Sequence, residues 1–131
     1  MATIFSRIIN GEIPCYKIAE NESCFAFLDI NPLAKGHTLV VPKTETDYIF
    51  DLEDKTLAEL MLFAKKIAPA IQSAVPCKRI GIAVLGLEVP HAHLHLVPIN
   101  SGYDIEFSKP KLHLSESEFA DIGSRIRQAI K

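Results

Sequence analysis

Several features that would assign a chain to a class at once are missing from this sequence. Its N-terminus has no basic region leading into a long apolar run, and no segment is long enough to span a membrane, so we expect no membrane partner. Lys and Arg number 14 and Asp and Glu number 16, giving a net charge of −2 with scattered signs, so we expect no nucleic-acid partner. The three cysteines form no CxxC pair and no even-numbered set, which favours a reducing, cytoplasmic location.

The chain also has no internal repeat, no low-complexity tract and no linker-like run. Since 131 residues suffice for one hydrophobic core, we expect a single domain over residues 1–131. Apolar residues make up 48% of the chain, a high share for a small domain that covers its own surface, which favours a homo-oligomeric interface. No glycine-rich phosphate loop and no paired-carboxylate metal site is evident in the sequence.

Apolar periodicity predicts three helices. A short helix is expected near the N-terminus, capped by Thr3. The clearest periodicity runs over residues 51–75, where Pro69 should kink or shorten the helix. Ser115 and Glu118 stand at capping-box spacing before a terminal amphipathic helix.

Three β-rich segments, at residues 23–30, 37–43 and 79–85, are predicted strands, and the histidine-rich segment that follows them is a fourth. Because helices are placed irregularly among these strands, the pattern favours an α+β fold over a regular βαβ array.

The densest chemistry lies in "VPHAHLHLVPIN", residues 89–100, which holds three of the five histidines. In a strand, successive side chains point to opposite faces, so His91, His93 and His95 should share one face while the apolar residues between them share the other. Same-face positions lie roughly 6.5–7 Å apart along a strand, close enough for the rings to converge on one small group.

The residues alone leave three interpretations of this run open. The rings could solvate a polar strand face, which is the weakest of the three because their neighbours are apolar. Alternatively, His-x-His could supply two imidazoles to zinc, with a remote residue completing the site. In the third interpretation a neutral imidazole attacks a phosphoryl or acyl centre while a protonated neighbour assists. Repulsion between like charges would then make the cluster titrate as a coupled unit, with at least one ring neutral near pH 7.

The segment "HAHLHLVP" resembles the His-x-His-x-His-x-x signature of the histidine triad (HIT) family of nucleotide hydrolases and transferases. "TIFSRIINGEIP" is similar to the family's opening segment and "FAFLDINPLAKGHTLVVPK" to its central strand pair. The resemblance implies an α+β fold with a five-stranded antiparallel sheet, a long central helix and a C-terminal helix, dimerising into a ten-stranded sheet. It also implies a HIT-like domain with its core at residues 3–98 and a C-terminal extension at residues 99–131.

The reaction that the resemblance implies needs neither metal nor cofactor. A histidine attacks the α-phosphate of a nucleotide, and water then cleaves the covalent nucleotidyl-histidine. By motif position His93 is the nucleophile, while His95 contacts the phosphate and the leaving-group side. His91 would support the nucleophile, and His37 matches a fourth histidine close to the site.

A nucleotide pocket is implied in the same way. Asp29 matches the carboxylate that binds the ribose hydroxyls, although its place before "NPLAKG" would equally suit a turn-capping residue. Apolar positions around the base match Phe5, Ile8, Phe27, Ile30 and Leu39. Strand alternation agrees in part, since it puts Phe27 on one face with Asp29, and Leu39 on one face with His37.

Two stretches depart from the family pattern. Where many members carry an Asn and a Gly-Gln-Ser or Gly-Gln-Thr stretch before the triad, this chain has "VLGLEVPH", with Leu87 and Glu88 in the glutamine and hydroxyl positions. Glu88 either faces away from a bound phosphate or meets a cationic leaving group such as an amine. Thr3 and Ser6 stand where some relatives carry a zinc-binding CxxC, so we expect no such zinc site.

Three functional classes follow from these patterns. The first is a metal-independent hydrolase of purine nucleoside phosphoramidates, with dinucleoside polyphosphates as the alternative substrate. The second is a nucleotide-binding module with weak turnover, which the "GLEVP" stretch favours. The third is a metal-dependent enzyme with histidine ligands.

Overall fold

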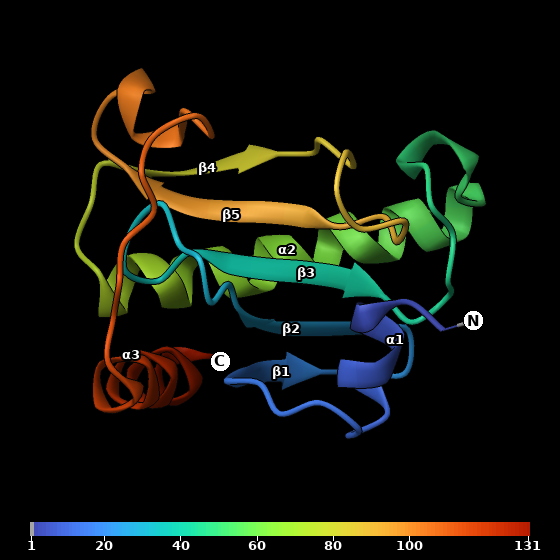
Figure 1. Cartoon of the computed structure of the whole chain (residues 1–131), viewed down its shortest axis with the longest axis horizontal. Helices are drawn as coiled ribbons and strands as arrows, with labels where there is room; N and C mark the ends of the chain where they lie inside the picture. Colours follow the sequence, from blue (N-terminus) through green and yellow to red (C-terminus); the bar gives the residue numbers. More distant parts are fainter. Residues whose placement is uncertain (1) are drawn as a thin grey trace.

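In the computed structural model, which describes residues 2–131, five strands form one antiparallel sheet accompanied by three α-helices (Figure 1). The strands are β1 (Lys17–Glu20), β2 (Cys24–Leu28), β3 (Thr38–Pro42), β4 (Arg79–Ala83) and β5 (Leu94–Ile99). The helices are α1 (Ile4–Ile9), α2 (Asp54–Ala74) and α3 (Glu116–Ala129), with 3-10 turns η1 (Ile49–Asp51) and η2 (Gly102–Ile105). This is the α+β architecture with a long central helix and a C-terminal helix that the sequence predicted.

The strands follow the order β1-β2-β3-β5-β4, with antiparallel neighbours throughout. Helix α2 runs along one face of the sheet, and α3 packs against α2 and β1 (Figure 1). The short helix α1 lies at the β1–β2 end of the sheet (Figure 1). The arrangement leaves β4 at one edge of the sheet, and it leaves the face opposite α2 available for a cavity beside α1.

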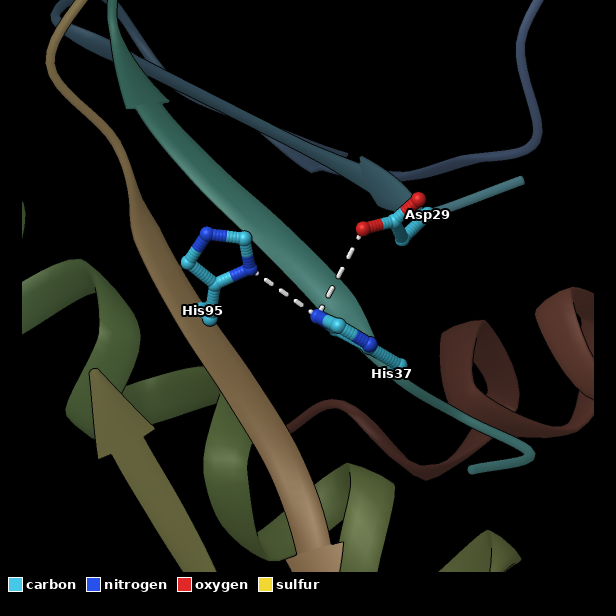
Figure 2. A group of neighbouring side chains, drawn as sticks. All are labelled: Asp29, His37 and His95. Carbon is cyan, nitrogen blue, oxygen red and sulfur yellow. Dashed lines mark hydrogen bonds and ion pairs between the residues drawn. The ribbon is translucent and has the colours of Figure 1, made fainter. Parts of the chain in front are cut away.

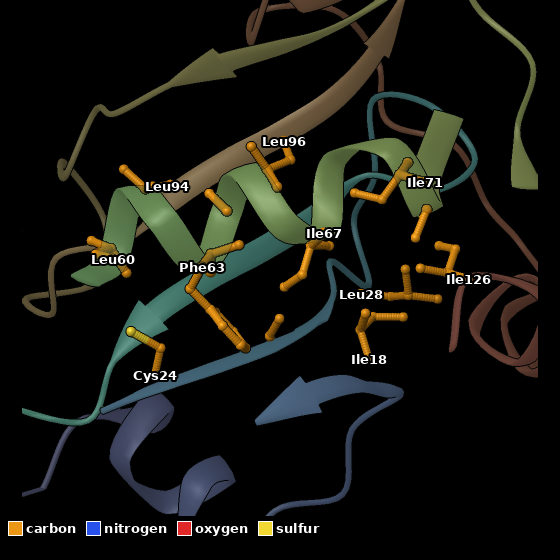
Figure 3. Close-up of a cluster of buried hydrophobic side chains, with 14 of the residues drawn as sticks. Ile18, Cys24, Leu28, Leu60, Phe63, Ile67, Ile71, Leu94, Leu96 and Ile126 are labelled. Atoms are coloured by element: carbon orange, nitrogen blue, oxygen red, sulfur yellow. The ribbon is translucent and has the colours of Figure 1, made fainter. Parts of the chain in front are cut away.

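Alternation along β2 divides the buried side chains into two clusters. Cys24, Ala26 and Leu28 join the core beneath α2, which Figure 3 shows with the helix side chains packed over it. Phe25 and Phe27 point to the other face and pack with side chains of α1. Fully burying one such large apolar side chain contributes roughly 1.5–3 kcal/mol, so both faces of β2 stabilise the fold.

The histidine run differs from the prediction in one respect. Only His95 lies inside β5, because the ladder with β3 begins at the pairing of Val40 with Leu94. The segment before it is held instead by a hydrogen bond from the backbone N–H of Ala92 to the carbonyl of Thr46, at 2.7 Å. The predicted alternation still applies, since Ala92, Leu94 and Leu96 join the core beneath α2.

Both predicted N-caps are confirmed, and of the two effects predicted for Pro69, a kink or a shortened helix, the shortening does not occur. The side chains of Thr3 and Ser115 accept hydrogen bonds from backbone N–H groups of their first turns, and Glu118 completes the capping box of α3. Helix α2 continues through Pro69 to Ala74. Pro69 is exposed, so water can bond the carbonyl that loses its helical partner.

One strand, β1, was not anticipated from the sequence. It has four residues, its register shifts between Lys17 and Ala19, and only Ile18 of its residues is buried. So short and irregular an edge strand carries almost no alternation, and its pairing with β2 decides its conformation.

Candidate active site

A cavity of about 460 Å³ opens on the face of the sheet opposite α2, beside α1. This volume lies within the usual range for small-molecule sites. Its walls come from α1, the ends of β2 and β3, the middle of the sheet at β5, the β4–β5 loop and the chain after η2. Most of the lining is apolar, and its charged or titratable members include Asp29, His37, Glu88, His93, His95 and Lys111.

His37, immediately before β3, faces His95 of the neighbouring strand β5 (Figure 2). The Nε2 atom of His37 lies 3.0 Å from Nδ1 of His95, and the backbone N–H of Leu33 donates to Nδ1 of His37, also at 3.0 Å. Because Nδ1 of His37 is an acceptor, the proton of the neutral ring is on Nε2 and is donated to His95. His95 then carries its own proton on Nε2, so the ring presents a hydrogen-bond donor on its other side.

His93 has the opposite tautomer. Its Nδ1 lies 2.7 Å from the carbonyl oxygen of His91, and a carbonyl only accepts, so Nδ1 carries the proton. The lone pair of the neutral ring is therefore on Nε2. His93 lines the cavity, and the ring of Phe5 packs edge-on against it with centroids 4.9 Å apart. A ring with an available Nε2 lone pair thus lies beside His95, whose ring presents an N–H, with ring centroids 4.9 Å apart.

Burial keeps these rings neutral. Loss of hydration, reinforced by neighbouring charges including that of His95, lowers the pKa of His37 to about 3. Burial likewise lowers the pKa of His95 to about 4. Burial also lowers the pKa of His93, although the hydrogen bond to the His91 carbonyl opposes that shift. The sequence predicted at least one neutral ring near pH 7. Neither His93 nor His95 is the protonated neighbour of that interpretation, because burial lowers the pKa values of both rings.

His91 lies behind the cavity wall and is fully buried. Its Nε2 faces the carbonyl of Pro42 at 2.8 Å, and its Nδ1 faces the hydroxyl of Thr3 at 2.8 Å. The ring therefore anchors the segment that carries His93, while its backbone carbonyl receives the Nδ1–H of that residue.

Asp29 lies at the end of β2, beside His37 (Figure 2). One carboxylate oxygen accepts from the backbone N–H of Asn31 at 2.8 Å, which confirms the turn-capping interpretation. The other lies 3.6 Å from Nε2 of His37, and the side chain lines the cavity. Burial raises the pKa of Asp29, with Asn31 and Lys111 opposing the rise and Glu88 adding to it. Capping a turn and facing a ligand are thus compatible here.

Asp29, His37 and His95 also bring one possible ligand atom each to within 4.8 Å of one another, a spacing that a divalent cation can bridge. Metal-bound imidazoles normally donate their other N–H to an acceptor. Here Nδ1 of His37 already accepts from Leu33, so ligation through Nε2 would require a ring without protons or the loss of that hydrogen bond. The donor set is therefore poorly suited to a metal.

The predicted base-binding residues gather at the cavity. Phe5, Ile8, Phe27 and Leu39 form one buried cluster that lines it. Ile30 also lines the cavity, at its rim, with 65% of its surface exposed. The structure thus brings together every predicted site residue except His91, which acts from behind the wall.

The β4–β5 loop places Glu88 at the cavity, although the residue is exposed. Its negative charge adds to the rise in the pKa of Asp29 and opposes the lowering of the pKa of His93. The Glu88 carboxylate therefore acts on the site through its charge. Leu85 and Leu87 of the same loop also line the cavity and are exposed. Gly86 between them has a φ of 69°, a conformation that side-chain-bearing residues rarely adopt.

Two residues of the chain after η2 complete the wall and were not anticipated. The ring of Phe107 packs edge-on against His95, with centroids 4.7 Å apart. The ammonium of Lys111 donates to the carbonyls of Phe107 and Lys109. Its positive charge opposes the rise in the pKa of Asp29 and adds to the lowering of the pKa of His37. No local pattern in the sequence links these residues to the histidines, since the contact depends on how the C-terminal segment folds back.

The chain has an α+β fold in which one face of an antiparallel sheet presents neutral imidazoles to a largely apolar cavity. These features are those of a small-molecule-binding domain. The chain belongs to the histidine triad family, because a HIT domain model matches residues 10–102. The matched range includes Asp29 and all four clustered histidines, and it excludes α1 as well as Phe107 and Lys111. The predicted family membership is confirmed.

Relatives match along most of the chain. An uncharacterised HIT-like protein of Borreliella burgdorferi is 35% identical over 97% of both chains, and an adenosine 5'-monophosphoramidase of Schizosaccharomyces pombe is 34% identical over 100% of both. Among solved structures, a HIT-like protein from Bartonella henselae matches with a TM-score of 0.85 and 30% identity, covering 98% of this chain and 96% of that one. Within residues 2–131, no helix combines the length and apolar character needed to cross a bilayer.

Proposed function

We propose that this chain is a nucleotide hydrolase that attacks the α-phosphate of a purine nucleoside phosphoramidate through a covalent intermediate on His93. The observation that carries the proposal is the pairing of opposite tautomers, since a ring with its lone pair on Nε2 lies beside one that holds a proton on Nε2. The similarity to an adenosine 5'-monophosphoramidase supports the reaction class.

In the first step Nε2 of His93 forms a bond to phosphorus while the phosphorus–nitrogen bond of the substrate breaks. The leaving nitrogen departs as a neutral amine from the N-protonated form of the phosphoramidate, and the Nε2–H of His95 donates a hydrogen bond on the leaving-group side while it keeps its proton. The positive charge that develops on His93 is stabilised by its Nδ1–H bond to the His91 carbonyl. His37 holds His95 in the tautomer that can donate.

In the second step water attacks the same phosphorus. The bond between His93 and phosphorus breaks, the proton that the water loses passes through the freed Nε2 of His93 to solvent, and a nucleoside monophosphate leaves. Both rings return to their starting tautomers, so the cycle consumes one water and needs neither metal nor cofactor.

The remaining groups of the cavity support the choice of substrate. The buried apolar cluster around Phe5 supports a binding site for the base, and the carboxylate of Asp29 in the cavity lining supports a role as acceptor for the ribose hydroxyls. Glu88 adds a negative charge where a polar neutral residue would suit a second phosphate, so a leaving amine fits better than a polyphosphate.

A nucleotide-binding module with weak turnover is a second candidate, because exposed Leu85 and Leu87 occupy the loop that supplies polar phosphate contacts in related proteins. Steady-state kinetics separates the two candidates. Wild-type protein should cleave an adenosine or guanosine phosphoramidate faster than a diadenosine polyphosphate, with excess EDTA present in every assay. The weakly active module would bind the nucleotide but show little turnover of any substrate.

The covalent intermediate is tested with His93→Ala, which should lower kcat by on the order of 10³-fold or more while nucleotide affinity is largely kept. Acid-quenched wild-type protein should carry one added nucleotidyl group by mass spectrometry, and the variant none. His113→Ala is the matched control, because His113 is exposed and does not line the cavity. Near-normal turnover by His93→Ala would remove His93 from the nucleophile's role.

We also propose that two chains pair through β4 into a ten-stranded sheet. β4 lies at an edge of the sheet, and Ile82 and the following Val84 and Leu85 are exposed apolar residues on or beside it. The opposite edge strand, β1, is irregular and is packed against α3, so it is the less suitable edge for pairing.

A further inference from the structure

Three polar residues at the N-terminus of α1 and in the loop after β3, Thr3, Ser6 and Glu45, form a hydrogen-bonded cluster with His91, and none of the four lines the cavity. The Glu45 carboxylate accepts from the backbone N–H of Thr3 and from the hydroxyl of Ser6, both at 2.7 Å. The hydroxyl of Thr3 in turn lies 2.8 Å from Nδ1 of His91, a residue 88 positions later in the chain. The cluster thus connects the first helix, the loop after β3 and the first histidine of the triad.

We propose that Thr3 is a positioning residue for the nucleophile: its hydroxyl donates to Nδ1 of His91, and the Glu45–Ser6 pair holds Thr3 in place. The inference rests on the proposed function, because the group that it positions is His93. Thr3 lies outside the matched range of the family model and does not line the cavity, so neither the family match nor the cavity lining assigns it this role.

The direction of the Thr3 hydrogen bond follows from the surrounding partners. Nε2 of His91 faces the Pro42 carbonyl, which only accepts, so that nitrogen carries a proton and Nδ1 of the neutral ring accepts. Ser6 gives its hydroxyl proton to Glu45, and the backbone N–H of Ser6 bonds the Thr3 oxygen. The single hydroxyl proton of Thr3 is then left for His91, which lies closer than the Ser6 oxygen at 3.3 Å.

The position of His93 depends on this anchor because the sheet does not hold the segment. β5 begins at Leu94, so the backbone from His91 to His93 lies outside the ladder. The His91 carbonyl, which sets the tautomer and orientation of His93, is located by the ring bonds of His91 together with the Ala92 bond to Thr46. Removing the Thr3 donor frees one side of that ring.

The alternative role for Thr3 is purely structural, since its oxygen also caps α1 by accepting from Ser6. Substitutions distinguish the two roles. Thr3→Ser keeps both the donor and the cap, and Thr3→Val removes both. Thr3→Asp keeps a good N-cap acceptor but offers no hydroxyl proton to His91. Ser115→Ala removes the equivalent cap from α3, far along the chain, and is the matched control for cap loss alone.

Steady-state kinetics on an adenosine phosphoramidate should show kcat about five- to tenfold lower in both Thr3→Val and Thr3→Asp, the size expected for one lost hydrogen bond. KM should change by less than about twofold, and Thr3→Ser and Ser115→Ala should keep most of the wild-type kcat. If Thr3→Asp is as fast as wild type while Thr3→Val is slow, Thr3 is only a cap and the proposal fails. A raised KM at unchanged kcat overturns it as well.

A second readout does not require turnover, so it separates failure of this inference from failure of the proposed function. Long-range ¹H–¹⁵N spectra of ¹⁵N-histidine-labelled protein report which ring nitrogen is protonated. The wild-type His91 ring should show a proton on Nε2 and none on Nδ1, and Thr3→Val and Thr3→Asp should change that pattern while Thr3→Ser keeps it. A protonated Nδ1 in wild-type His91 overturns the proposal even if the enzyme is active.

Discussion

The burial of His37 should make the folded protein sensitive to mild acid, and replacing this residue should reduce that sensitivity. Its pKa is lowered to about 3 and that of His95 to about 4, from an ordinary value near 6.5. As pH falls through 6.5, the unfolded chain takes up protons on both residues and the folded chain does not. The free energy of unfolding therefore falls with a slope that rises from about 0.7 kcal/mol per pH unit at pH 6.5 toward about 1.4 near pH 5 for each residue, or toward about 2.7 for the pair.

His37→Gln removes one of the two rings that bind a proton only in the unfolded chain. The slope of the free energy of unfolding against pH should therefore drop by about 1.4 kcal/mol per pH unit near pH 5. The measurement is urea unfolding followed by far-UV circular dichroism between pH 6.5 and 5, because the chain has no tryptophan. This window avoids carboxylates such as Glu20, whose pKa is lowered to about 2 and which would add a slope of the same sign below about pH 4.5. Slopes are compared rather than absolute stabilities, since the substitution also alters the hydrogen bond to Leu33.

The exposed His113 provides the control, as His113→Gln should keep the wild-type slope. A flat wild-type profile, or equal slopes in wild type and His37→Gln, would show that the His37 ring is not held neutral. The tautomer assignment of the His37–His95 pair would then fail with it.

Two further predictions concern the nucleotide and the interface. Asp29→Ala should weaken AMP binding by about 1–3 kcal/mol, since a charged acceptor for the ribose is lost. Titration calorimetry measures the affinity, with Asp121→Ala as the control for loss of an exposed acid. Unchanged affinity in Asp29→Ala would reject the ribose role. Ile82→Glu should convert a dimer into a monomer by light scattering after gel filtration, whereas Leu112→Glu should not; a wild-type monomer, or a variant that stays dimeric, would rule out pairing through β4.

The sequence predicted the elements whose pattern is local. The caps at Thr3 and Ser115 depend on residues within one helical turn, and the alternation of β2 depends on neighbours two positions apart. The start of β5 could not be predicted in this way. Strand alternation continues through His91, but the ladder with β3 stops at the pairing of Val40 with Leu94, and that limit is set by a segment about 50 residues earlier in the chain.

The site shows the same division. That His93 and His95 both line the cavity followed from period-two alternation, and the residues around the base followed from the family resemblance. The tautomers did not, because each depends on where the folded backbone places one hydrogen-bonding group, such as the N–H of Leu33 beside His37 or the carbonyl of Pro42 beside His91, and side-chain alternation does not locate these groups. Phe107 and Lys111 were missed for a related reason, since the C-terminal segment carries no periodic link to the cavity that it lines.

The same burial accounts for both the chemistry and the stability of the site. A hydrated imidazole near pH 7 is a mixture of protonated and neutral forms, and only the neutral form has a lone pair for attack. Placing His93 and His95 beneath Phe5 and Phe107 removes water and favours the neutral form of both. Hydrogen bonds to fixed backbone groups then decide which nitrogen attacks and which donates. The resulting cost is loss of stability in acid, so a substitution that hydrates the triad should gain acid resistance and lose activity together.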